Sequence, residues 1–312
     1  MANNITHSIS RKTGTPGIEE LLSSKLNSSE LSSLLLEVYH QRSQQIKPAE
    51  LLKQYRNNKF VQPADADPIG CMEKELQVLR FLQQQQYIPI ELSPVAQFGS
   101  CSAVGTVNQK KILSAVRQTE VMADATNAIA LHIADIKQHQ PVNSLLRYCT
   151  IHRHIRAVHL PLKGYSPHFK IACMVAAARD TGNFEFELTT LREQLLHIHH
   201  LLTVIFGVQK IVVEIQPRSG YKNGEALIAA QMNTLQAQLP FEVRQAATKE
   251  NNYYKGLQFK VRMLVNEREF EIADGGFVDW TQQLLENKKE RCLISGIGIS
   301  LLHKLLLPES NL

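Results

Sequence analysis

Apolar residues recur with a helical period through the first part of the chain, from Ile18 to Tyr55. The run that follows Ser29 places five apolar side chains on one helix face: Leu31, Leu34, Leu35, Val38 and Tyr39. Ser29 can cap this helix, and Pro48 can occupy the first turn of a second helix. The sequence therefore opens with a predicted pair of amphipathic helices.

The pattern changes at residues 61–68, VQPADADP, which have no period and are rich in proline and aspartate. We take this segment as the linker between an N-terminal helical region and a main domain, with the helical region and linker at 18–67 and the main domain at 68–312. In the main domain, helical periods cover 71–86, 125–138, 187–206 and 226–238, and strand-like runs cover 87–94, 145–158, 168–178, 209–216, 241–248, 257–265 and 269–273. Because these strands have hairpin character and helices are inserted between them, we expect an α+β domain. Its single sheet should be antiparallel or mixed and flanked by helices.

The last quarter of the chain holds the clearest hairpin and two pairs of glycines. Strands at 257–265 and 269–273 should meet at a turn of residues 266–267. We expect the hairpin to end on Gly275-Gly276, where no side chain blocks a ligand or a neighbouring backbone. The second pair, in the tripeptide at 296–298, precedes a helical run. These glycines predict the floor and one wall of a nucleotide-sized pocket.

Composition narrows the class of protein. The content of 44% hydrophobic and 20% charged residues is typical of a soluble globular protein, and no apolar run is long enough to cross a membrane. The net charge of +5 permits an anionic ligand or nucleic acid without requiring one. Neither a P-loop nor a G-x-G-x-x-G motif occurs in the sequence.

The cysteines and the N-terminal residues indicate the cellular compartment in which the protein works. The five cysteines are scattered without a C-x-x-C pair, which argues against a disulfide framework and against a structural zinc site. We therefore expect a reducing compartment and a cytoplasmic location. Residues 1–17 are polar and lack the apolar core of a secretory signal, so we predict a disordered tail, with an organelle-targeting signal as the alternative.

Histidines and basic residues gather in the middle of the chain. The histidines at 152, 154, 159 and 168 predict a polar cleft lining, with a metal site as the alternative. Cys101 and Cys149 carry no nucleophile signature, so we expect buried thiols. A basic rim, or alternatively only a solvated face, could be formed by Arg147, Arg153, Arg156, Lys163, Lys170, Lys255 and Lys260.

Six segments then occur in a familiar order: YIPIELSP, VMADATNAIAL, RYCTIHRHIR with GYSPHFKI, NNYYKGLQFKV, ADGGFVDW and GIGISLLHKLL. In this order they resemble the first motif, the R-P-E-G-T segment, the second motif, the Y-Y-T-G-x-x-F signature, the A-G-G-G-R-Y-D signature and the third motif of class II aminoacyl-tRNA synthetases. The similarity is to histidyl-tRNA synthetases and to the synthetase-like regulatory subunit of ATP phosphoribosyltransferase, from Met72 to the C-terminus. It implies a class II synthetase-like core. We expect no C-terminal anticodon-binding domain.

The resemblance implies roles for individual residues. Arg156 falls at the second-motif arginine that holds the α-phosphate of ATP, and Lys249 replaces the arginine ahead of the double tyrosine, so both are catalytic candidates. Ligand-binding roles are implied for Asp124, Thr126, His168, Tyr253, Tyr254, Gly256, Gly275, Gly276 and Asp279. The implied cofactor is ATP with Mg²⁺, with no structural metal. A homodimer is implied through the sheet edge near Pro94.

Departures from the family pattern decide the predicted function. Val158 replaces an acidic residue of the second motif, Ser300 and Leu301 replace the third-motif Glu-Arg pair, and Phe277 replaces the arginine of G-G-R-Y-D. Loss of one such preorganised charge costs on the order of 10²–10³ in rate. We therefore predict a synthetase-like protein that has lost tRNA charging. It would bind an amino acid or nucleotide as a regulatory or partner subunit.

Two other functions stay open from the sequence. One is an active ATP-dependent ligase or amino-acid-activating enzyme that uses Arg156 with substituted partners such as Lys249 or His303. The other is an RNA-binding module that uses the basic rim.

Overall fold

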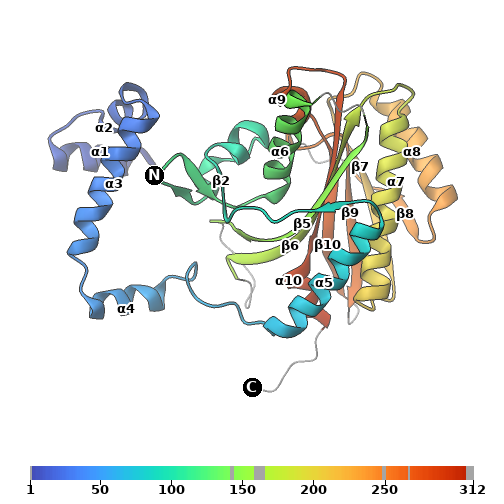
Figure 1. Cartoon of the computed structure of the whole chain (residues 1–312), viewed down its shortest axis with the longest axis horizontal. Helices are drawn as coiled ribbons and strands as arrows, with labels where there is room; N and C mark the ends of the chain where they lie inside the picture. Colours follow the sequence, from blue (N-terminus) through green and yellow to red (C-terminus); the bar gives the residue numbers. More distant parts are fainter. Residues whose placement is uncertain (1, 141–143, 158–165, 248–250, 266–267, 307–312) are drawn as a thin grey trace.

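The computed structural model describes residues 2–140, 144–157, 166–247, 251–265 and 268–306. They are organised around a mixed eight-stranded sheet with the order β1-β5-β6-β11-β10-β9-β7-β8 (Figure 1). The strands are β1 (Ile88–Pro89), β5 (Leu146–Ile155), β6 (His168–Arg179), β7 (Ile211–Pro217), β8 (Glu242–Gln245), β9 (Lys255–Val265), β10 (Arg268–Val278) and β11 (Glu290–Gly298). Among the strands that the structure describes, only the two at the edges of this sheet pair in parallel, β1 with β5 and β8 with β7. The predicted α+β class is confirmed.

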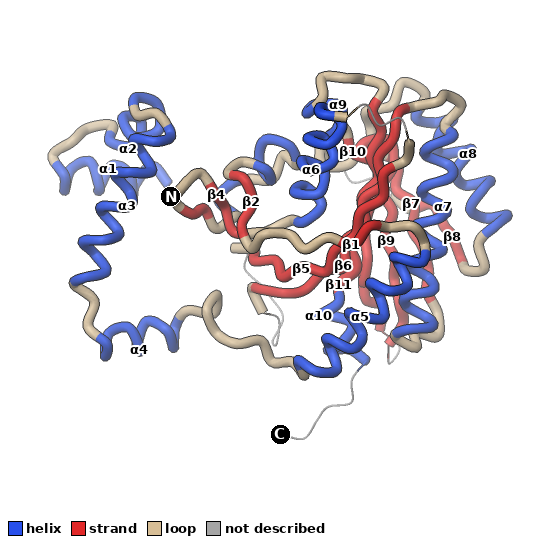
Figure 2. The backbone as a smooth tube through the Cα atoms, viewed as in Figure 1, coloured by secondary structure: helices blue, strands red, loops and turns tan. Residues whose placement is uncertain are grey.

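Helices cover both faces of the sheet and divide its core into two layers (Figure 2). One layer contains α5 (Pro68–Gln84), α7 (Glu185–His200), η4 (Leu201–Ile205), α8 (Gly224–Gln238) and α10 (Ile299–Leu306). The other contains α6 (Ala125–His139) and α9 (Trp280–Leu284), with Trp280 1% exposed. Among the described ranges, no helix is both long and apolar enough to cross a membrane.

A small second sheet lies ahead of α6, with the order β2 (Val95–Gln97), β4 (Thr119–Val121) and β3 (Ser114–Ala115). Between its strands the chain forms two short turns of helix, η2 (Ser100–Val104) and η3 (Gln109–Lys111). The fully buried Glu120 links η2 to η3, because its carboxylate accepts hydrogen bonds from residues of both turns: Gly99, Ser100, Cys101 and Gln109. Burial alone would raise the pKa of Glu120, but these hydrogen bonds hold it below its usual value. These hydrogen bonds to Glu120 hold the segment between β2 and β4 in place ahead of α6.

The glycine pair Gly275-Gly276 lies inside β10 and not at the end of a hairpin, which corrects the prediction. A Cβ atom on Gly275 would lie 2.4 Å from the carbonyl oxygen of Ile294, and one on Gly276 would lie 2.4 Å from that of Leu257. Glycine is required because β9 and β11 approach β10 closely on both sides. The predicted turn at 266–267 lies outside the described residues.

The N-terminal helices lie apart from the sheet in Figure 1. They are α1 (Ala2–Thr13), α2 (Ile18–Glu20), η1 (Leu21–Lys25), α3 (Ser28–Gln44) and α4 (Pro48–Asn57). The helix α1 occupies the segment predicted as a disordered tail. Asn27, not Ser29, caps α3 through a capping box with Glu30, while Pro48 begins α4 as predicted. No residue from α2 to α4 is buried. The division of the chain at 67–68 stays a prediction.

Candidate functional site

A cavity of about 480 Å³ opens on the sheet face that carries α6. Its walls come from β5, β6, β9, β10 and β11 and from the loops around η2 and η3. The lining residues are Cys101, Val107, Lys111, Ile112, Ala123, Asp124, Thr126, His154, Arg156, Ile171, Cys173, Asn251, Tyr253, Tyr254, Gln258, Asp274, Ile294, Ser295 and Gly296. The volume is within the usual range for a small-molecule site, roughly 300–1,000 Å³.

Asp124 joins the start of α6 to the double tyrosine. Its Oδ1 accepts hydrogen bonds from the backbone and hydroxyl of Thr126, at 3.0 and 2.6 Å, so that Asp124 caps the helix. Its Oδ2 accepts a hydrogen bond of 2.5 Å from the phenol of Tyr253. Burial and the charge of Asp124 raise the pKa of Tyr253 well above its usual value, so the phenol remains the donor. The carboxylate is thus held in one orientation.

Arg156 supplies a fixed positive charge at the end of β5. Its Nε donates a hydrogen bond of 3.0 Å to the carbonyl of Ala123, and its guanidinium lies 5.6 Å from the ring centre of Phe169. Burial lowers its pKa, but the charges of Asp124 and Asp274, among others, more than offset this, so the pKa lies above its usual value. Within the described residues no carboxylate forms an ion pair with Arg156. Its two terminal amino groups form no hydrogen bond with the part of the chain that the structure describes.

His154 is a neutral residue in the cavity wall. Burial lowers its pKa to about 3. Its Nε2 accepts a hydrogen bond of 3.1 Å from the backbone of Ala125, so the proton of the neutral ring is on Nδ1. That Nδ1 has no hydrogen-bond partner in the part of the chain that the structure describes. His154 helps to place the first residue of α6 and leaves one donor unused.

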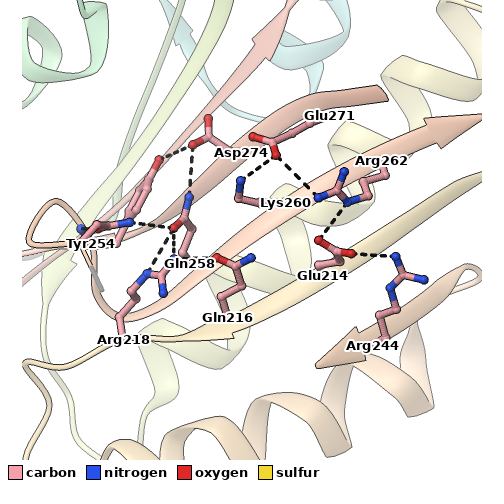
Figure 3. A network of polar contacts seen from close by, with 11 residues as sticks. Glu214, Gln216, Arg218, Arg244, Tyr254, Gln258, Lys260, Arg262, Glu271 and Asp274 are labelled. Carbon is pink, nitrogen blue, oxygen red and sulfur yellow. Dashed lines mark hydrogen bonds and ion pairs between the residues drawn. The ribbon is translucent and has the colours of Figure 1, made fainter. Parts of the chain in front are cut away.

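Asp274 extends the polar wall along β10. Its Oδ2 accepts hydrogen bonds from the phenol of Tyr254 at 2.9 Å and from Nε2 of Gln258 at 3.5 Å. Figure 3 shows the side chain of Gln258 between Asp274 and Arg218. Arg218 donates to Oε1 of Gln258 from Nε at 3.2 Å and from Nη2 at 2.5 Å, and Asn251 donates to the same oxygen at 3.1 Å. These bonds direct the amide nitrogen of Gln258 toward Asp274.

The predicted site residues divide into three groups. Five line the cavity: Asp124, Thr126, Arg156, Tyr253 and Tyr254. The others that the structure describes are absent from its lining: His168, Gly256, Gly275, Gly276 and Asp279. Lys249, the remaining predicted site residue, lies outside the described residues, as does Val158, where the sequence departs from the second motif. The ligand-binding roles themselves remain predictions.

The residues away from the cavity have structural contacts. His168 lies between Nη1 of Arg153, at 2.9 Å, and the carbonyl of Gln62, at 2.8 Å. Asp279 lies 3.7 Å from Nζ of Lys255 and accepts a hydrogen bond from Gln283. His168 thus contacts the segment around Gln62, and Asp279 contacts the start of α9.

Three positions at which the synthetase motifs have a charged residue carry an uncharged side chain in this protein: Phe277, Ser300 and Leu301. Phe277 is 1% exposed and packs against Phe186 and Tyr221, with ring centres 6.4 and 6.3 Å away. Ser300 accepts a hydrogen bond from the backbone of Lys170, and Leu301 packs against the core. The side chains that replace the two arginines are therefore parts of the fold.

Asp274, Gln258 and Ser295 line the cavity although they are not among the predicted site residues. A signal for Asp274 was present, since it occupies the first glycine of the A-G-G-G-R-Y-D pattern. Gln258 carries no such signal, because its orientation comes from Arg218, 40 positions away. Ser295 is 1% exposed, and its hydroxyl has no hydrogen-bond partner among the described residues.

The cavity lining also contains two thiols, Cys101 and Cys173. Burial raises the pKa of Cys101 and of Cys173, so both thiols are protonated. Among the residues that the structure describes, no three histidine, cysteine, aspartate or glutamate side chains gather as a metal site.

Solved structures share this fold, although no protein-family model and no curated protein matches the sequence. The chain is similar to apo histidyl-tRNA synthetase of S. aureus, with 14% identity, a TM-score of 0.61 and coverage of 78% of this chain and 68% of that one. It is also similar to an ATP phosphoribosyltransferase regulatory subunit/histidyl-tRNA synthetase from Bacillus halodurans, with 13% identity, a TM-score of 0.62 and coverage of 80% and 83%. At these identities the likeness concerns the fold alone. The predicted class II synthetase-like fold is confirmed.

Proposed function

We propose that this protein binds a free amino acid in the cavity, as a synthetase-like protein that does not charge tRNA and serves as a regulatory or partner subunit. The observation that carries the proposal is that Arg156 and Asp124, which carry opposite charges, line the same cavity near the start of α6. Among the described residues no hydrogen bond uses the two terminal amino groups of Arg156, and Asp124 is held by Thr126 and Tyr253. An α-carboxylate and an α-ammonium group are the charges that complement this pair.

The charges in the cavity argue against adenylation. Phosphoryl chemistry requires several fixed cations around the phosphates. In the described lining only Arg156 and the exposed Lys111 are cationic. The suggested substitute His303 is 6% exposed and packs edge-on against Phe206, 5.7 Å between ring centres, and burial lowers its pKa. Binding of an amino acid without its activation is therefore the function that the cavity supports best.

Calorimetry and pyrophosphate exchange test this function. The protein is titrated with a panel of free amino acids, then with ATP and Mg²⁺, and is assayed for exchange. Binding of an amino acid without exchange is the expected result. Exchange that Arg156→Ala abolishes would establish the amino-acid-activating alternative. If no amino acid binds and RNA binds with a strong salt dependence, the proposal is wrong and the RNA-binding alternative holds.

A further inference from the structure

We infer that the ligand carries a second, permanently cationic group, an ammonium or guanidinium on its side chain, and that Asp274 recognises it. The inference rests on the proposed function, because it names the class of amino acid that the same cavity takes. It assigns a specificity-determining role to a carboxylate at a position where the family pattern has glycine.

The free oxygen of Asp274 is the first observation. The hydrogen bonds that Tyr254 and Gln258 donate to this carboxylate both end on Oδ2. No described residue donates to Oδ1 and none forms an ion pair with Asp274, although it lines the cavity. Figure 3 shows this second oxygen turned away from Tyr254 and Gln258. A carboxylate in a partly closed cavity gains most from a charged donor.

The charge balance of the lining is the second observation. Two carboxylates, Asp124 and Asp274, face one fixed cation, Arg156, while Lys111 is exposed to solvent. The α-groups of an amino acid match Arg156 and Asp124, which leaves Asp274 unmatched. Burial raises the pKa of Asp274 above its usual value, although the hydrogen bond from Tyr254 and the charge of Arg156 lower it. A cationic side chain would therefore balance the site and restore solvation that the carboxylate has lost.

The rigidity around Asp274 is the third observation. Arg218 is 7% exposed and, among the described residues, forms hydrogen bonds only with uncharged oxygens of Gln216, Pro217 and Gln258. It fixes the oxygen of Gln258, so that the amide nitrogen can only face Asp274 (Figure 3). A preorganised acceptor loses little side-chain freedom when a ligand binds, which favours selectivity.

The rest of the lining suits a side chain of this kind. Ile171, Ile294 and Cys173 give the cavity an apolar wall, along which the methylenes of lysine, ornithine or arginine can lie. The buried hydroxyl of Ser295 lines the same cavity without a partner in the described chain and is a further acceptor for an ammonium group.

The test compares ligands that differ only in the terminal charge. Calorimetry at neutral pH measures lysine, ornithine and arginine against norleucine and glutamine, with wild type, Asp274→Asn, Asp274→Gly and Glu271→Gln. Glu271 is the matched control, because it is an exposed carboxylate on the same strand that pairs with Lys260 outside the cavity. Thermal melts of each variant report whether it is folded. The wild-type ligand series gives a result even if the Asp274 variants do not fold.

We expect at least one cationic ligand to bind about tenfold or more tightly than norleucine and glutamine. Asp274→Asn and Asp274→Gly should remove that preference, and Glu271→Gln should keep it. If wild type binds norleucine or glutamine as tightly as the cationic ligands, the inference is wrong while the proposed function stands. If no amino acid binds at all, both fail. A preference that survives in a folded Asp274→Asn variant also overturns the inference.

Discussion

The phenol oxygen of Tyr253 lies 2.5 Å from Oδ2 of Asp124, and this contact joins two segments that are 129 positions apart in the chain. Asp124 begins α6, and Tyr253 lies just before β9. The cavity therefore depends on a bond between the start of a helix and a strand of the central sheet.

Tyr253→Phe should lower the free energy of unfolding by about 1–3 kcal/mol, since it removes a hydrogen bond to a charged acceptor. Amino-acid affinity should fall as well, because Asp124 would be held by Thr126 alone. Urea denaturation and calorimetry measure the two effects. Tyr39→Phe, on the exposed face of α3, is the control and should change neither quantity. Unchanged stability in Tyr253→Phe would mean that the bond does not form in solution.

Arg156→Gln should weaken amino-acid binding by about tenfold to a hundredfold, the usual value of a charge-assisted hydrogen bond. Glutamine retains a donor but loses the charge that faces the α-carboxylate. Arg80→Gln removes the same charge from an exposed position on α5 and should leave the affinity unchanged. Equal affinity in the two variants, measured by calorimetry, would remove Arg156 from the binding site.

Phe277→Arg, which introduces the arginine of the G-G-R-Y-D pattern, should destabilise the protein by about 3 kcal/mol or more and should not create exchange activity. The new guanidinium would be buried between Phe186 and Tyr221. Phe98→Arg places the same side chain at an exposed position and is the control. A stable Phe277→Arg protein with pyrophosphate exchange would show that position 277 can face the cavity.

The pH dependence of stability should contain a contribution from His154. Burial lowers its pKa in the folded protein to about 3, whereas the unfolded value is about 6.5. Between these two pKa values the unfolded state binds a proton at His154 and the folded state does not. The folded protein therefore loses stability as the pH falls below about 6.5. His154→Gln should flatten the dependence by up to about 1.4 kcal/mol per pH unit. Urea titrations between about pH 4 and 7 measure the slope; identical slopes would contradict the assignment.

Much of the fold could be predicted from local pattern. Apolar alternation located β5, β6 and β9, and the helical period located α6, α7 and α8. The glycines of β10 could not be placed, because Gly275 and Gly276 look like a corner in sequence. Only the distance to Ile294 and Leu257 on the neighbouring strands shows why they lie mid-sheet.

The site was predictable where it matched a motif and not where it depended on long-range bonds. Asp124, Arg156 and Tyr253 lie together as the motifs imply. His168 has the right residue type and spacing, but its ring is bonded to Arg153 and the linker. No sequence period reports that contact, because its partners are up to 106 positions apart.

That contact also decides where the protein can be shortened. The carbonyl oxygen of Gln62 accepts a hydrogen bond of 2.8 Å from Nε2 of His168, whose Nδ1 accepts from Arg153. A chain that starts at Pro68 would lack Gln62. His168 would then lose the acceptor of its Nε2, while its Nδ1 would keep the contact with Arg153. A chain that starts just before Gln62 would keep the hydrogen bond between Gln62 and His168 and would lack α1 to α4. A shortened protein for crystallisation and calorimetry should therefore begin before Gln62 and not at Pro68.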